Sequence, residues 1–344
     1  MPTELLNTLY VQTQGASLHL DGEAIRVYLP EDKAKRILPL RRYDSLVVYG
    51  HVSLSTDLIT QCAEDGRAVT WMSRSGRFIG RLDGPQRGNI LLRHAQHNAH
   101  DDQARRLGIA RPVVAGKLQN SRQVLIRAAR DATSERQEAL REAAADIAEM
   151  IPPVATASSL DELMGIEGNA ARRYFSVFSH LVTAHSDLPP LTSRTRRPPT
   201  DPLNALLSFG YGLLRGLVHG AAETVGLDPH LGFLHGIRPA KPALVLDLME
   251  EFRTPLADRL VLNLVNRRQV TRSDFETLPG GAVRLCEDGR KTVLTAWQAW
   301  RSEEREHPLL GRNVPHGLLP VVQARLLARH LRGELPCYIP WTPI

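Results

Sequence analysis

Three acidic side chains in an otherwise apolar helical segment restrict most strongly how this chain can fold. The segment is 244–253, LVLDLMEEFR, in which Asp247 precedes Glu250 and Glu251 by three and four residues. On a helix, residues at these spacings share one face and lie about 5–6 Å apart. The apolar neighbours predict a mostly buried helix, and a buried acidic cluster requires a cation, either an arginine or a metal ion. The fold must therefore bring positive charge to this helix.

The first part of the chain has the patterning of short strands. Residues 17–20 and 23–29 alternate in polarity around Asp21-Gly22, a strong signal for a β-hairpin. A buried strand is expected at 46–50, a short helix from near Ser55 to Asp65-Gly66, and strands at 68–72 and 77–82 around a turn at 73–76. Several short strands separated by turns predict a β-sandwich-like domain over residues 1–95, with a small open barrel as the alternative.

The composition then changes, which predicts a domain boundary. Residues 93–102 are polar, lack strand alternation and predict a linker at 96–103. His94, His97 and His100 recur every third residue and are either metal ligands on one helical face or part of a solvated linker. Residues 104–333 predict an all-α domain, interrupted by one hairpin at 282–294 around Asp288-Gly289, and 334–344 an extended tail. The fold class expected is α+β with two domains.

The basic residues are almost all arginines. The chain has 43 basic and 37 acidic side chains, a formal charge of +6, and only five of the 43 are lysines. The planar guanidinium suits bidentate contact with phosphate, so a polyanionic partner is one interpretation. The other is that a GC-rich genome writes arginine in place of lysine, and composition does not separate the two.

Cysteine usage and the chain start favour a cytoplasmic protein. Cys62, Cys286 and Cys337 are odd in number and far apart, and no C-x-x-C occurs, which is typical of a reducing compartment. The start of the sequence lacks the pattern of a signal peptide, and no apolar run reaches the roughly 20 residues needed to span a bilayer. We expect a soluble cytoplasmic protein with no membrane partner.

Two further residues could join the acidic helix in one site. Glu167 lies between Gly165 and Gly168 in a predicted helix, and these glycines would allow another helix or a ligand to approach closely. His235 lies in the segment GFLHGIRP and is either a core histidine or a ligand. Carboxylates and one imidazole from separate elements form a mixed O/N site that suits Mn²⁺ or Mg²⁺.

Four segments together resemble one known family. They are GIEGN at 165–169, RPPTDPLNALLSF at 197–209, LHG at 234–236 and LDLMEEFR at 246–253, in this order. The chain resembles the CRISPR-associated integrase/endonuclease, the first in the Cas numbering, over essentially its whole length. The resemblance implies a β-rich domain that forms a homodimer and an all-α catalytic domain that binds the metal.

The resemblance also implies roles for individual residues. Glu167, His235 and Glu250 correspond to metal ligands, and Asp247 to a supporting acid. Because some relatives have aspartate at the position of Glu250, the neighbouring Glu251 is an alternative third ligand. Arg238 and Lys241 follow His235 and are the cations best placed for DNA phosphates, with solvated surface charge as the other interpretation. Tyr174, Tyr211 and Ser208 are expected to pack or to contact DNA, because the reaction requires no protein nucleophile.

The implied reaction is the insertion of captured DNA as a new spacer into a CRISPR array. A 3′-hydroxyl attacks a phosphodiester at the edge of the repeat, and the implied partners are double-stranded DNA and a small ferredoxin-like CRISPR-associated protein. Two alternatives remain open. One is a metal-dependent nuclease acting on branched DNA without integrase activity, and the other is a non-catalytic DNA-binding scaffold. A scaffold gives no reason to bury three carboxylates.

Overall fold

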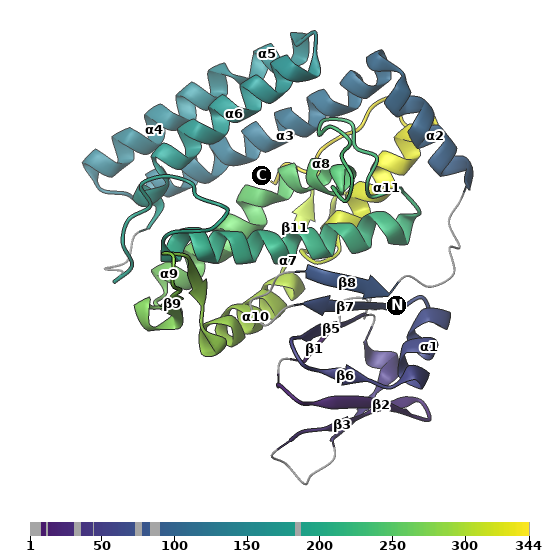
Figure 1. Ribbon diagram of the computed structural model, residues 1–344. Coiled ribbons are helices and arrows are strands. Elements are labelled where there is room, and N and C mark those ends of the chain that lie inside the picture. Colours follow the sequence, from purple (N-terminus) through teal and green to yellow (C-terminus); the bar gives the residue numbers. More distant parts are fainter. Residues whose placement is uncertain are drawn as a thin grey trace. The chain divides into compact units, whose positions relative to one another are not determined.

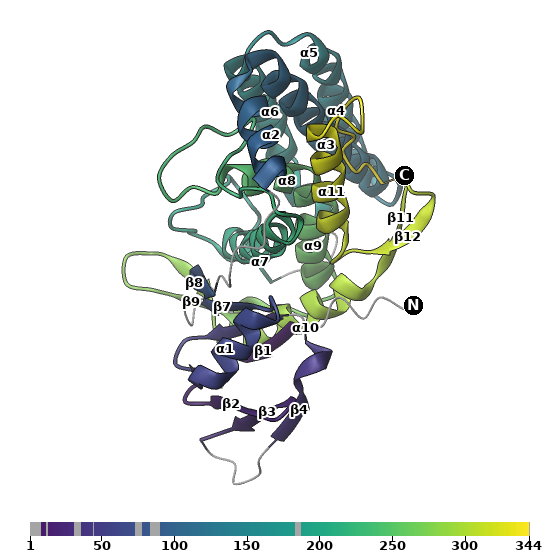
Figure 2. The ribbon, with the colours of Figure 1, turned by 90° about the vertical axis from the view of Figure 1, so that its right-hand side faces the viewer.

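Alternating apolar residues near the amino terminus form two four-stranded sheets (Figures 1 and 2). The computed structural model describes residues 8–11, 13–30, 36–43, 45–72, 78–82, 90–182 and 187–343. One sheet has the order β1 (Thr8–Val11), β5 (Ser45–Tyr49), β7 (Ala68–Met72), β8 (Phe78–Leu82). The other has the order β4 (Arg36–Pro39), β3 (Ala24–Tyr28), β2 (Ser17–Asp21), β6 (Ser53–Leu54).

The two sheets share one hydrophobic core, which supports the sandwich-like prediction. Leu18 and Ile25 from one sheet and Leu46 and Val69 from the other belong to a single buried cluster. Helix α1 (Thr56–Glu64) adds side chains to it, and Ser55 caps this helix as the sequence predicts. The hairpin of β2 and β3 is confirmed, with Gly22 at a φ of +58° in its turn. The predicted turn at 73–76 lies outside the described residues.

The boundary between the two parts lies earlier than predicted. The chain divides into compact units at residues 1–87 and 88–344. Helix α2 (Ile90–Asp101) and helix α3 (Gln103–Arg130) occupy the region predicted as a 96–103 linker. The linker prediction is wrong because Leu92, Gln96 and Ala99 recur on one face and are fully buried. The polar residues between them are the outer face of a helix.

The second unit is rich in helices. Its further helices are α4 (Ser134–Glu149), α5 (Ile151–Thr156), α6 (Leu160–Ser176), α7 (Pro202–Val225), α8 (Ala243–Phe252), α9 (Arg259–Asn266), α10 (Glu287–Ser302) and α11 (Leu319–Leu331). A π-helical turn, Arg253–Asp258, connects α8 to α9. Helix α3 packs against α4, α6 and α8, and its length is evident in Figure 1. None of the described helices is long and apolar enough to cross a membrane.

This unit also contains strands, so the expectation of an all-α domain is wrong in detail. Strand β9 (Phe275–Thr277) pairs with β10 (Val283–Leu285), and β11 (Glu304–His307) pairs with β12 (Arg312–Pro315). The predicted hairpin around Asp288-Gly289 is also wrong. Cys286 caps α10, and both residues lie in its first turn. Gly289 is needed there because a Cβ would lie 2.6 Å from the carbonyl oxygen of Asp274.

The carboxyl-terminal segment is extended but belongs to the core. No helix or strand is assigned to the described residues after α11. Tyr338 and Trp341 are nevertheless each only 1% exposed, and the Trp341 ring packs at 5.7 Å from that of Phe252 at the end of α8. The segment predicted as a tail therefore covers one side of the acidic helix.

Candidate active site

Helix α8 carries three buried acidic residues, but each has its own set of partners. Asp247, Glu250 and Glu251 are at most 3% exposed. Asp247 is bonded to the loop before α8, Glu250 is paired with α3, and Glu251 is bonded to the carboxyl-terminal segment. The prediction that all three share one face is wrong, because consecutive helical residues are about 100° apart and a different element meets each carboxylate.

Asp247 organises the loop that carries His235. Its Oδ2 accepts hydrogen bonds from the backbone N–H groups of Phe233 and Leu234, the latter at 3.0 Å. Its Oδ1 accepts the N–H of His235 at 2.9 Å and lies 2.7 Å from the imidazole Nδ1. The loop approaches so closely that a Cβ on Gly232 would lie 2.8 Å from Oδ2. Asp247 thus fixes the orientation of the ring and leaves Nε2 for a ligand.

The same loop is held from the opposite side by α2 and α3. His100 Nδ1 donates to the carbonyl oxygen of Gly232 at 2.6 Å, and Arg106 Nε donates to that of Phe233 at 2.9 Å. His100 is therefore a structural residue. The described residues include no metal-binding group formed with His94 and His97. Anchored on both sides, His235 remains 25% exposed at its side chain.

Lys117 of α3 joins Glu250 to Glu167 of α6. Its Nζ contacts Oε1 of Glu167 and lies 2.6 Å from Oε2 of Glu250. Glu250 also accepts a hydrogen bond from Arg253 Nε at 3.1 Å. Burial by itself would raise the pKa of Glu250, but the charges of Arg253, Lys117 and His235 lower it to about 2. The fold thus brings Glu167 and Glu250 together at Lys117 from two separate helices, and the charge of His235 also acts on Glu250.

Glu251 lies in a different environment from its neighbour. Its carboxylate accepts hydrogen bonds from the Tyr338 hydroxyl, from the Trp341 N–H and, at 2.9 Å, from Gln323 Nε2. Burial raises the pKa of Glu251 to about 8, although these hydrogen bonds act to lower it. All of its partners are neutral donors in the core, so Glu251 fixes the carboxyl-terminal segment on α8.

An aromatic and acidic network supports Arg253 from behind. The guanidinium lies 4.9 Å from the ring centroid of Tyr211, and that of Arg194 lies 5.5 Å from the same ring. The Tyr211 hydroxyl donates to Asp258 at 2.7 Å. Tyr174 is 3% exposed, and Ser208 Oγ accepts from Arg194 at 3.2 Å. These contacts make Tyr174, Tyr211 and Ser208 packing residues.

Arg238 and Lys241 lie in a surface turn just after His235. The Lys241 N–H donates to the carbonyl oxygen of Arg238 at 3.0 Å, which closes the turn. Arg238 is exposed and Lys241 is half-buried. Neither side chain forms an ion pair within the described residues, so both are free to meet an anion that approaches His235.

No helix among the described residues packs against the glycines beside Glu167. A Cβ placed on Gly165 or Gly168 would meet no atom of the described residues within 4 Å. Of the two interpretations of these glycines, close packing of a second helix is therefore wrong. The surface beside the Glu167 carboxylate is open to a ligand.

Lys117 and Arg253 are the functional residues that the sequence interpretation did not identify. The burial of the acidic helix indicated that a cation was needed, but not which one. Lys117 lies 133 positions from Glu250, counted along the chain between the two residues of this ion pair. The only signal in the sequence is that Lys117 is one of five lysines in an arginine-rich chain.

The donor types of this site fit a divalent metal ion. In the described parts of the chain, however, no three or more His, Cys, Asp and Glu side chains are arranged so that they could hold one. Two carboxylates from separate helices already converge on one positive charge, that of Lys117. The imidazole of His235 has its Nδ1 bonded to Asp247, and its charge acts on Glu250. Carboxylate oxygens with one imidazole are ligands typical of Mn²⁺ and, with water, of Mg²⁺.

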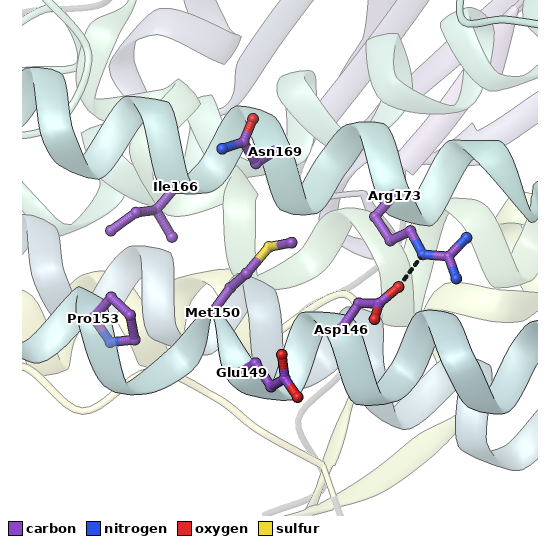
Figure 3. A pocket seen from close by; sticks show the side chains of 7 residues that line it. All are labelled: Asp146, Glu149, Met150, Pro153, Ile166, Asn169 and Arg173. Atoms are coloured by element: carbon purple, nitrogen blue, oxygen red, sulfur yellow. Dashed lines mark hydrogen bonds and ion pairs between the residues drawn. The ribbon is translucent and has the colours of Figure 1, made fainter.

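A cavity elsewhere in the helical unit is distinct from this site. It measures about 320 Å³ and is lined by residues of α4, α5 and α6, including Met150, Ile166 and Asn169. Figure 3 shows these side chains and the ion pair of Arg173 with Asp146 at its rim, 2.5 Å long. None of the predicted site residues lines it.

Comparison with known proteins identifies the family of this chain. Residues 9–299 match the family model described as CRISPR associated protein Cas1. A CRISPR-associated endonuclease Cas1 from Moorella thermoacetica is 47% identical over 338 residues, 98% of each chain. A solved CAS1 protein from Thermotoga maritima has a TM-score of 0.81 at 25% identity and covers 95% of this chain and 97% of its own.

A second solved structure extends the likeness in fold. A casposase bound to integration product has a TM-score of 0.82 at 23% identity and covers 97% of this chain and 92% of its own. The family model covers most of the chain, and the relative's identity extends over nearly the whole length of both proteins. The resemblance seen in the four sequence segments is confirmed, and the chain belongs to the Cas1 family of CRISPR-associated proteins.

Proposed function

We propose that this protein is a metal-dependent DNA endonuclease/integrase that inserts captured DNA fragments as new spacers into a CRISPR array. One observation carries the proposal. Glu167 and Glu250, on separate helices, meet at one cation, Lys117, and Asp247, on the same helix as Glu250, sets the orientation of His235. A scaffold that only binds DNA gains nothing from ionised carboxylates held at such a site.

The reaction exchanges one phosphodiester for another. The 3′-hydroxyl oxygen of the fragment forms a bond to the phosphorus at the 5′ edge of a repeat strand, and the 3′-oxygen of the flanking DNA, which was bonded to that phosphorus, leaves with the proton. When bound by Glu167, His235 and Glu250, Mn²⁺ or Mg²⁺ would supply Lewis-acid stabilisation of the charge that develops on the phosphoryl oxygens. No covalent protein intermediate is required, in keeping with the packing roles of Ser208, Tyr174 and Tyr211.

The chain's own residues position the reactants. Asp247 keeps His235 Nδ1 hydrogen-bonded, so only Nε2 faces the site. Arg253 keeps Glu250 ionised and in place. The open surface beside Glu167 and the turn that carries Arg238 and Lys241 provide a path for DNA, in which these two cations contact the flanking phosphates.

A strand-transfer assay tests this function against the alternative of a branched-DNA nuclease. The full chain is incubated with a repeat-bearing plasmid and a DNA fragment with 3′-hydroxyl ends, with Mn²⁺ or Mg²⁺ and with chelator. We expect covalently joined fragment at the repeat edge, abolished by chelator and by blocked 3′ ends. Cleavage of branched DNA without any joined product, with the partner protein present, would favour the nuclease.

We further propose a homodimer formed through residues 1–95 and an assembly with a small ferredoxin-like CRISPR-associated protein. Ile37 and Ile79 are 61% and 59% exposed on the edge strands β4 and β8. Edge strands with exposed apolar residues need cover, and a symmetric pairing provides it. Light scattering should show a dimer of the full chain and a monomer for a protein that starts at residue 88, where the second unit begins. A monomeric full chain at micromolar concentration would contradict this arrangement.

A further inference from the structure

Three arginines converge in the helical unit away from the metal-binding residues. They are Arg127 in the last turn of α3, Arg259 at the start of α9 and Arg305 on β11. None of the three guanidinium groups forms an ion pair or donates a hydrogen bond to another described residue. The Arg259 guanidinium lies 5.7 Å from the ring centroid of Trp300. We call Arg127, Arg259 and Arg305 the arginine cluster.

The members of the arginine cluster repel one another. Burial and the charges of Arg305 and Arg127 lower the pKa of Arg259 to about 10, opposed by Glu303. The pKa of Arg305 is also lowered, by burial and by Arg127. Glu303 is exposed and forms no ion pair with them. Each arginine therefore disfavours the charged form of its neighbour, and an anion bound among them would reduce this repulsion.

Buried polar atoms beside the cluster also lack partners. His316 is 2% exposed, and its ring lies 4.8 Å from that of Trp300. Its Nδ1 donates to the Trp300 carbonyl oxygen, whereas neither its Nε2 nor Trp300 Nε1 has a hydrogen-bond partner among the described residues. The pKa of His316 is lowered to about 4 by burial and by Arg305 and Arg259, so the ring lies against these two charges. In this neutral ring Nδ1 carries the proton, so Nε2 is an acceptor and only the Trp300 N–H is a donor left for an anion among the unpaired arginines.

The register of two helices fixes the distance from this cluster to the active site. Helices α3 and α8 run side by side in the same direction, because Lys117 pairs with Glu250 and Ser121 Oγ bonds Thr254 Oγ1 at 3.1 Å. Arg127 follows Lys117 by ten residues on α3, about 15 Å at 1.5 Å per residue. Arg259 follows Glu250 by nine residues and comes directly after the π-helical turn, so the distance is taken from α3 alone.

We propose that the arginine cluster binds backbone phosphates of the same DNA whose junction phosphate lies at Glu167 and Glu250. Successive phosphates of one strand advance about 3.4 Å along the duplex axis. A separation of about 15 Å therefore places the contacted phosphates about four base pairs from the junction. This inference rests on the proposed function. It adds a second phosphate site, one that sets the position of the duplex.

Binding measurements on a branched DNA that mimics the joined intermediate test the proposal without requiring catalysis. The variant is Arg127→Gln/Arg305→Gln, and the matched control is Arg329→Gln/Arg332→Gln, which removes the same charge from two exposed arginines that pair with Glu334. For the native chain and the control we expect the same slope of log affinity on log salt. For the cluster variant the slope should fall in magnitude by about 1.8, or about 0.9 per lost phosphate contact.

Neutral methylphosphonates locate the contact. Each is placed singly along the DNA, and those about three to five base pairs from the junction should weaken binding by the native chain and by the control. Those at the phosphates contacted by Arg127 or Arg305 should have no further effect on the cluster variant, which retains Arg259. A thermal melt checks that each variant is folded. Arg127→Gln alone, at a half-buried residue without a hydrogen-bond partner, is the fallback and should lower the slope by about 0.9.

The outcomes separate this inference from the proposed function. An unchanged salt slope for the cluster variant, or methylphosphonate effects that persist in it, would overturn the inference while leaving the proposed function intact. If Glu167→Gln keeps full joining activity, the proposed function fails even where the slope changes as expected. Failure of the native chain to bind the branched DNA would overturn both.

Discussion

Glu250 and Glu251 are adjacent in the sequence and equally buried, yet their surroundings are opposite. Glu250 is met by two cations, Lys117 and Arg253, which lower its pKa to about 2. Glu251 is met by a hydroxyl, an amide and a backbone N–H, and burial raises its pKa to about 8. The first carboxylate stays charged on the side of α8 that faces Glu167. The second is enclosed in the core.

This difference separates a ligand from a structural acid better than burial or sequence spacing does. A carboxylate that binds a divalent cation must be ionised and must lie beside other charged or donor groups. One enclosed by neutral donors contributes by satisfying those donors, because an unpaired buried polar group costs free energy. We therefore assign Glu250, and not Glu251, as the third metal ligand in the proposed function. The following predictions test that assignment.

The largest expected effect is on catalysis. Glu250→Ala, Glu167→Ala and His235→Ala should each reduce strand transfer by about 10³-fold or more, because the metal's stabilisation of developing charge is lost. DNA affinity should change little, since it comes from arginines elsewhere. Strand transfer and DNA binding are measured on the same preparations.

Glu251→Gln is the matched control for that series. The glutamine keeps an oxygen that can accept hydrogen bonds from the core donors, and strand transfer should stay near the native level. An inactive Glu251→Gln together with an active Glu250→Ala would reverse the assignment of the third ligand.

For stability we expect the opposite order, with a larger effect at Glu251 than at Glu250. Glu251→Ala leaves Tyr338, Gln323 and the Trp341 N–H without their buried acceptor, and the free energy of unfolding should fall by about 3 kcal/mol. Glu250→Ala removes a negative charge from between two cations, which then repel each other. We expect a smaller loss of unfolding free energy, because Lys117 still forms its ion pair with Glu167. Urea unfolding of both variants measures the difference. Equal losses would mean that the two environments do not differ as described.

Sequence interpretation identified α8 and the change from strands to helices because each depends on local patterning, whereas the ligand roles of Glu167 and His235 are predictions implied by the family resemblance. The hairpin at Asp21-Gly22 and the Ser55 cap are local in the same sense. It could not separate Glu250 from Glu251, because Gln323, Tyr338 and Trp341 lie 72 to 90 residues away in the chain. Lys117 was missed for the same reason. The linker error at 96–103 arose because a helix with few apolar residues resembles a loop.

A smaller effect is expected when the orientation of His235 is disturbed. Asp247→Asn preserves shape but replaces one accepting oxygen with an NH₂ group, which cannot accept all the hydrogen bonds that Asp247 now receives. Strand transfer should fall about 10- to 100-fold, as for other groups that orient a metal ligand. Metal titration of activity should show a weaker apparent affinity. A variant with native metal dependence would mean that Asp247 does not orient His235 as a ligand.

The smallest expected effect extends the comparison to His316, a buried imidazole beside two arginines. Burial and the charge of Arg305 lower its pKa to about 4 in the folded protein, from an ordinary value of 6.5. Below pH 6.5 the unfolded chain therefore takes up the proton while the folded chain does not. The free energy of unfolding is therefore unaffected by the titration of His316 above pH 6.5. It falls by about 1 kcal/mol per pH unit as the pH is lowered from 6.5 toward 4.

His316→Gln removes this titration, so the difference in unfolding free energy between the native chain and the variant should shrink steadily between pH 6.5 and pH 4. Arg305→Gln should narrow the pH range over which stability changes, because the pKa of His316 then lies closer to its ordinary value. It should not abolish the change, because burial lowers this pKa more than the charge of Arg305 does. Urea unfolding across this pH range measures both. If the difference between native and His316→Gln is constant with pH, the imidazole titrates normally and is not held against the arginine cluster.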